Sequence, residues 1–137
     1  TFEITESALM ADPAAALDVL ERIAALGCRL SIDDFGTGYS TMAQLNELPY
    51  SEMKLDQSFI RNAATDREAR AIVESSIELG HKLGMKVVAE GVERQEDWDL
   101  IAELMCDEGQ GFFIARPMRG EEVPSWLGHW NACLGRE

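Results

Sequence analysis

The chain has 137 residues, 46% of them hydrophobic, and a formal net charge of −13. This length and composition suit one globular domain with an ordinary core and exclude an intrinsically disordered tail. Binding of a nucleic-acid polymer through a basic patch is also excluded, because 25 acidic residues outnumber 12 basic ones. An anionic ligand would therefore need bound cations.

Apolar and polar residues alternate over residues 2–5, which predicts a first strand. An acidic N-cap and Pro13 then begin a helix with apolar positions at helical spacing, and this helix ends near Gly27. A second strand is predicted over residues 29–34. A glycine-containing loop and a short helical stretch that ends at Pro49 follow it.

The second half of the chain continues to alternate strands with helices. In order, we predict a short strand over 52–56, the longest helix over 67–83, a strand over 86–90, a helix over 96–105, a strand over 109–114 and a last helix over 121–130. This alternation indicates an α/β fold of parallel βαβ units, which form either an open doubly wound sheet or a barrel.

Charged or polar residues recur at the carboxyl end of each predicted strand. They are Glu3 with Glu6, Asp33 with Asp34, Lys54 with Asp56, Glu90 with Glu93, and Gln110. For any single acidic residue, a helix cap or a solvated loop charge is the commoner role. In a barrel, however, these ends converge on the face where barrel enzymes keep their active sites, so the recurrence favours one shared site.

Carboxylates gathered at one mouth repel one another, and divalent cations would relieve that repulsion. Ligation by oxygen alone favours Mg²⁺ or Mn²⁺ over zinc, and the adjacent Asp33 and Asp34 could ligate two neighbouring ions. Lys54 could orient a water molecule or neutralise charge on a phosphate. The same groups would also suit an enolase-type enzyme that removes a proton beside a carboxylate.

Three cysteines are scattered through the chain and form no paired motif, so neither a disulfide framework nor a zinc site is indicated. A cytoplasmic location is therefore expected. No apolar run approaches the roughly 20 residues that cross a bilayer. Any membrane tether of the full-length protein is expected outside this chain.

Five motifs together resemble the EAL domain family, and the resemblance runs along the whole chain. They are EITE at residues 3–6, DDFGTGYS at 33–40, KLD at 54–56, AEGVE at 89–93 and QGF at 110–112. The resemblance implies that residues 1–137 are the C-terminal half of an EAL phosphodiesterase domain. The fold implied is the C-terminal part of a (β/α)8 barrel of the TIM type, with about five strands here and the N-terminal strands upstream.

The resemblance also implies hydrolysis of cyclic di-GMP to linear pGpG with two Mg²⁺ or Mn²⁺ ions. The implied metal ligands are Glu3, Asp33, Asp34 and Asp56, the implied catalytic residues are Lys54, Glu90 and Glu93, and the implied supporting or substrate-binding residues are Gln110, Glu6, Gly36, Thr37 and Gly38. A degenerate domain that binds cyclic di-GMP without cleaving it is the alternative, which an upstream glutamate and asparagine would decide. Open sheet edges would favour a homo-oligomer or association with the upstream half.

Overall fold

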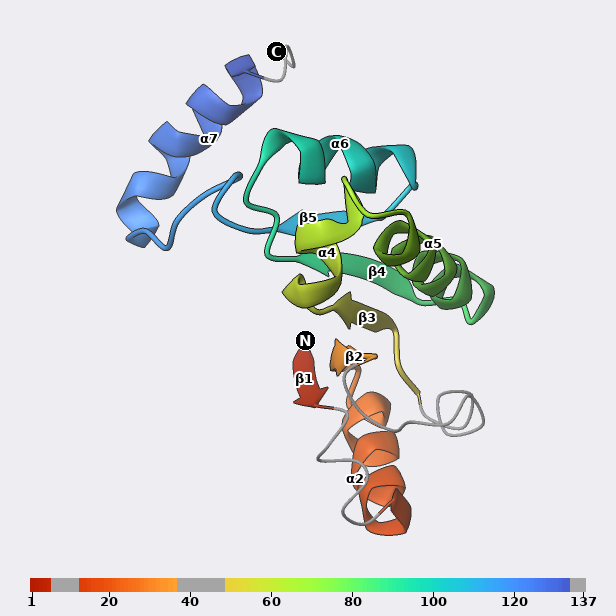
Figure 1. The fold of residues 1–137 in the computed structure, drawn as a ribbon. Helices are drawn as coiled ribbons and strands as arrows, with labels where there is room; N and C mark the ends of the chain where they lie inside the picture. Colours follow the sequence, from red (N-terminus) through yellow and green to blue (C-terminus); the bar gives the residue numbers. More distant parts are fainter. Residues whose placement is uncertain (6–12, 37–48, 134–137) are drawn as a thin grey trace.

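The computed structural model describes residues 1–5, 13–36 and 49–133. Within these ranges five strands form one parallel sheet (Figure 1). They are β1 (Phe2–Thr5), β2 (Leu30–Phe35), β3 (Glu52–Leu55), β4 (Lys86–Glu90) and β5 (Glu108–Gln110). The strands lie side by side in chain order without the reversal that marks a doubly wound sheet, so the arrangement is that of a barrel wall.

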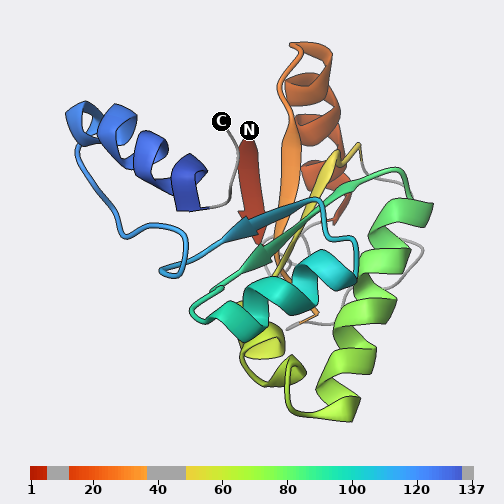
Figure 2. The same ribbon diagram turned by 90° about the horizontal axis from the view of Figure 1, so that it is seen from above.

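Within the described ranges, helices follow β1, β3 and β4 and continue past β5. The structure describes α2 (Pro13–Ala25), α4 (Gln57–Ala63), α5 (Arg67–Lys82), α6 (Gln95–Glu103) and α7 (Val123–Cys133), with a short 3-10 helix η1 (Gly120–Glu122) before α7. Figure 2 shows α5 and α6 on the same side of the sheet, whereas α7 extends away from it. None of the helices in the described ranges has the length and apolar content needed to cross a membrane.

The central strands carry the core. Val87, Val88 and Ala89 of β4 are all buried, the near-continuous apolar run expected of a central parallel strand. Helix α5 covers this strand closely, because a Cβ atom at Gly80 would lie only 2.5 Å from Cγ2 of Val87. In contrast, β1 lies at one edge of the sheet and is largely exposed.

The sequence misplaced the end of one strand and the bounds of one helix, and it missed another helix. Strand β5 ends at Gln110, and residues 111–114 form a turn in which the N–H of Ile114 donates to the carbonyl oxygen of Gly111 at 3.1 Å. Helix α4 was not predicted, since seven residues are too few for a clear helical period. The last helix begins at Val123, which leaves Pro124 in the first turn where its missing N–H costs little, and it runs to Cys133. The helical stretch predicted before Pro49 lies outside the described residues.

Candidate active site

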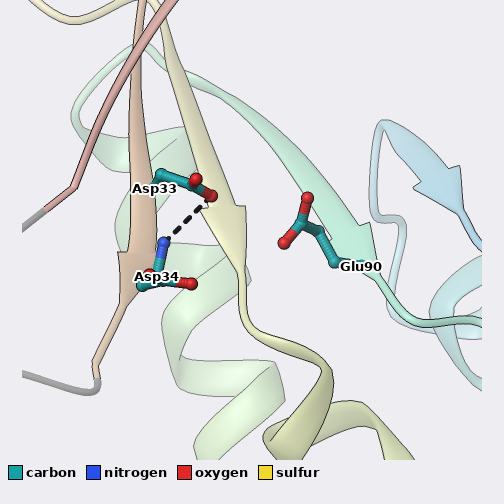
Figure 3. Close-up of side chains that lie close together, drawn as sticks. All are labelled: Asp33, Asp34 and Glu90. Atoms are coloured by element: carbon teal, nitrogen blue, oxygen red, sulfur yellow. Dashed lines mark hydrogen bonds between the residues drawn. The ribbon is translucent and has the colours of Figure 1, made fainter.

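A β-bulge sets Asp33 and Asp34 side by side at the end of β2. The register pairs Ile32 with Met53 and Phe35 with Leu55, so two residues of β2 face the one residue between Met53 and Leu55. Side chains of a regular strand alternate between faces, and a bulge re-aims one of them. Asp34 has a left-handed φ of 56°, a conformation that aspartate tolerates better than most residues do. Both carboxylates therefore face β4 (Figure 3).

Asp33, Asp34 and Glu90 form a cluster of three carboxylates. Each offers one oxygen, and the three oxygens lie within 4.8 Å of one another. The backbone N–H of Asp34 donates to Oδ1 of Asp33 at 3.1 Å, which restrains the first carboxylate. The side chains of Asp33 and Glu90 are 23% and 21% exposed, so solvent or a ligand can still reach them.

The ammonium of Lys54 lies among these carboxylates and also reaches β1. Its Nζ atom is 2.7 Å from Oε1 of Glu90, 3.1 Å from Oε2 of Glu3 and 3.3 Å from Oδ1 of Asp33. Burial of Lys54 disfavours the charged form, but hydrogen bonds to Glu90 and Glu3 outweigh that effect and raise its pKa above the ordinary value. Lys54 is therefore a fixed cation on β3 that joins this strand to β1, β2 and β4.

One ammonium cannot balance the four carboxylates of Glu3, Asp33, Asp34 and Glu90. The donors are all carboxylate oxygens, supplied by β1, β2 and β4 and partly open to solvent. This set fits hard divalent cations such as Mg²⁺ or Mn²⁺, which prefer oxygen ligands, and it lacks the nitrogen and sulfur donors typical of zinc. The described residues therefore suit the metal expected from the sequence.

An open hollow of about 340 Å³ adjoins the carboxylates. It is lined by Asp34, Asp56, Gln57, Glu90, Gly91, Glu93, Gln110, Gly111 and Phe112. The ends of β2, β4 and β5 and the start of α4 thus meet around one space. No role was predicted for Gln57, Gly91, Gly111 or Phe112, although each lies in or beside one of the five motifs.

The remaining predicted site residues have different surroundings. Oδ1 of Asp56 accepts the backbone N–H of Ser58 at 2.9 Å and caps α4, and hydrogen bonds from Ser58 lower the pKa of Asp56. Asp56 therefore lines the hollow without belonging to the three-carboxylate cluster. Gly36 has a left-handed φ of 91°, and a Cβ there would lie 3.0 Å from the ring of Phe59. Glu6, Thr37 and Gly38 lie outside the described residues.

Comparison with known proteins identifies the family. Residues 1–117 match the EAL domain, so the chain belongs to the EAL domain family. The bifunctional diguanylate cyclase/cyclic di-GMP phosphodiesterase MucR of Pseudomonas aeruginosa is 46% identical over 121 residues, which make up 88% of this chain and 18% of MucR. This chain therefore spans less than a fifth of that relative.

Solved structures extend the likeness to the fold. The PaMucR phosphodiesterase in its c-di-GMP complex has a TM-score of 0.83 at 45% identity, over 88% of this chain and 49% of that one. The manganese/cy-diGMP complex of Klebsiella pneumoniae BlrP1 has a TM-score of 0.78 at 34% identity, over 84% of this chain and 29% of that one. The five parallel strands with their helices thus match part of the TIM-like barrel of EAL structures, which confirms the predicted family and fold class.

Proposed function

We propose that this chain supplies the C-terminal part of the active site of a cyclic-di-GMP phosphodiesterase, which hydrolyses one phosphodiester bond and releases linear pGpG. The carrying observation is the cluster of Asp33, Asp34 and Glu90 held around the ammonium of Lys54. Identity of 46% to MucR, whose name includes cyclic di-GMP phosphodiesterase, supports this substrate.

The residues divide by what they can do chemically. Glu3, Asp33 and Asp34 would hold two Mg²⁺ or Mn²⁺ ions, with Asp56 beside them. When bound, such ions lower the pKa of a water molecule and stabilise the charge that develops on the phosphate. Lys54 holds Glu90 and Asp33 in place and can donate to an oxygen of the substrate. Glu90 can accept the proton of the attacking water, so no covalent intermediate is required.

The rim of the hollow supplies the substrate contacts in this proposal. Glu93 and Gln110 both line the hollow, Glu93 from the segment that follows β4 and Gln110 from the end of β5. Their polar groups can accept from or donate to the sugar or base edges of cyclic di-GMP. Phe112 is 53% exposed at the same hollow and offers an apolar face.

We further infer that residues 1–137 form the C-terminal part of an eight-stranded EAL barrel, as the sequence predicted. Two observations support this: the sheet has five strands in chain order within the described ranges, and the chain covers 49% of the PaMucR structure. Upstream strands would then complete the metal site. The cytoplasmic location expected from the sequence stays a prediction.

The test is product analysis on the full-length protein with Mn²⁺ or Mg²⁺. We expect conversion of cyclic di-GMP to linear pGpG, and we expect Asp33→Asn to lower turnover by at least about a hundredfold, since it removes one charged ligand. Asp18→Asn, the same substitution on the exposed surface of α2, is the matched control and should leave turnover unchanged. Unchanged turnover in Asp33→Asn would contradict the assignment. Binding of cyclic di-GMP without any product would favour the receptor alternative.

A further inference from the structure

Two arginines tie the segment after β4 to helix α4 in opposite directions. Nη2 of Arg94 donates to the carbonyl oxygen of Arg61 at 2.8 Å, and Nη2 of Arg61 donates to Oε1 of Glu93 at 3.2 Å. Helix α4 starts directly after Asp56, and the segment over residues 91–94 starts directly after β4. The two hydrogen bonds therefore join the elements that leave two neighbouring strand ends of the candidate site.

Asp97 anchors this connection from the first turn of α6. It is 1% exposed, and its Oδ2 accepts the backbone N–H groups of Glu93 at 3.3 Å and Arg94 at 3.1 Å. The guanidinium of Arg94 closes the arrangement, with Nη2 2.7 Å from Oδ1 and Nε 3.3 Å from Oδ2 of Asp97. A carboxylate buried to this degree is costly unless it is paired and hydrogen-bonded, and here all its partners belong to residues 93 and 94.

Residues 91–94 pack closely against α4, so that a displacement of these residues would also displace groups of the candidate site. A Cβ atom at Gly91 would lie 2.3 Å from Cβ of Gln57, so the two backbones meet without space between them. The N–H of Val92 donates to the carbonyl oxygen of Gln110 at 3.0 Å, which links the segment to the end of β5. A shift of residues 91–94 would therefore also displace Gln57 and Gln110, which line the hollow.

We propose that Arg94 and Asp97 are positioning residues for this site. Together they hold residues 91–94 against α4. This keeps Glu93 in the lining of the hollow and keeps Glu90 in its ion pair with Lys54. The kinetic consequence rests on the proposed phosphodiesterase function, whereas the structural consequence rests on the hydrogen bonds alone. A pair that only stabilised α6 would leave the geometry of the hollow unchanged when it was removed.

The test uses the full-length protein with Arg94→Ala, Arg94→Lys and Asp97→Asn. The matched control is Arg70→Ala, which removes the arginine–carboxylate pair between α5 and α6 away from the hollow. Two quantities are measured: amide hydrogen exchange over residues 91–97, and kcat and KM for cyclic di-GMP with Mn²⁺. The two conservative variants keep the test informative if the alanine variant folds poorly.

We expect Arg94→Ala to speed exchange at the amides of residues 93 and 94 and to lower kcat about tenfold to a hundredfold, the scale of a misplacement near 1 Å. KM should change less than about threefold, because the loss falls on catalytic geometry. Arg94→Lys should recover part of both effects, since one ammonium cannot reach Asp97 and the Arg61 carbonyl as a planar guanidinium does. Arg70→Ala should change neither quantity.

Unaltered exchange at residues 93 and 94 in both Arg94→Ala and Asp97→Asn would overturn the inference, and so would an equal loss of kcat in Arg70→Ala. A wild-type protein that did not hydrolyse cyclic di-GMP would instead contradict the proposed function. In that case the exchange measurement alone decides whether Arg94 and Asp97 hold the segment.

Discussion

Nζ of Lys54 on β3 lies 2.7 Å from Oε1 of Glu90 on β4, and the same ammonium contacts Glu3 on β1 and Asp33 on β2. Four successive strands, β1 to β4, therefore contribute to one ion-pair network. Carboxylates this close together repel one another, and the ammonium of Lys54 between them offsets part of that repulsion. The stability of the sheet end and its affinity for divalent cations are thus expected to depend on the same residue.

Replacement of Lys54 tests this dependence. We expect Lys54→Met to lower the free energy of unfolding by roughly 1–3 kcal/mol, less than for a fully buried pair because the carboxylates keep solvent access. Added Mn²⁺ should restore part of the loss, because an ion that binds the folded state stabilises it. Urea denaturation with and without Mn²⁺ measures both effects.

Lys86→Met is the matched control, since the pair between Lys86 and Glu108 is about half exposed at the other end of β4. It should change stability by about 0.5 kcal/mol or less, with no added response to Mn²⁺. Equal behaviour of the two variants would contradict the special role of Lys54.

Gly91 is expected to be intolerant of any side chain. Its φ of 67° is left-handed, and a Cβ there would lie 2.3 Å from Cβ of Gln57. We expect Gly91→Ala to destabilise the protein by about 3 kcal/mol, the sum of a backbone penalty and overpacking. Gly84→Ala is the control: its φ of 75° carries the same backbone penalty, but no atom lies within 4 Å of the added Cβ. It should cost only about 1 kcal/mol, and equal losses in urea denaturation would count against close packing at Gly91.

Hydrophobic periodicity predicted the sheet well because its central strands are buried runs. A strand was predicted over residues 86–90, and the structure has β4 at Lys86–Glu90. The fifth strand failed because Phe112 and Phe113 look like strand residues, whereas the turn over residues 111–114 carries them. At Gly111 the chain packs directly against the backbone of residue 92, since a Cβ at Gly111 would lie 2.1 Å from the carbonyl oxygen of Val92. A propensity scale contains no information about such a tertiary contact.

The candidate site was predictable in its residues more than in its geometry. Strand-end positions sufficed to select Asp33, Asp34 and Glu90, which the structure brings together. The bulge that turns both aspartates to one face depends on a positive φ at Asp34, and the sequence carries no signal for it. The pair of Arg94 and Asp97 was missed for another reason: charges in the first turn of a helix usually belong to a solvated face, yet Asp97 is buried.

Cys106 should react slowly with thiol reagents. Burial raises the pKa of its thiol to about 11, and its single S–H faces two carbonyl oxygens, of Val87 at 3.3 Å and of Glu108 at 3.4 Å from Sγ. Because the thiolate is the nucleophile, only about one molecule in a thousand is reactive at pH 8. The rate of reaction of Cys106 should rise about tenfold per pH unit up to that pKa.

Iodoacetamide labelling followed by mass spectrometry should therefore modify the exposed Cys133 before Cys106. Faster labelling of Cys106 in the folded protein would contradict its burial.

The two edges of the sheet lead to a prediction about association. Among the described strands, β1 pairs only with β2, and β5 pairs only with β4. An unpaired strand edge is a template for another chain, and here Phe2 adds an apolar side chain that is 54% exposed. We expect residues 1–137, expressed alone, to self-associate, with a mass by light scattering above that of one chain. A monodisperse, well-folded monomer would contradict this expectation.

A charge placed on the edge separates pairing through β1 from general stickiness of the surface. Phe2→Lys should shift the chain toward the monomer, because a lysine on an edge strand opposes pairing with another strand. Val123→Lys replaces an apolar side chain that is 40% exposed on α7, an element far from β1 in sequence, and should leave association unchanged. Equal effects of the two substitutions would mean that exposed apolar surface in general, rather than the β1 edge, drives association. Loss of association in Phe2→Lys alone would identify the β1 edge as the surface through which copies of the chain pair.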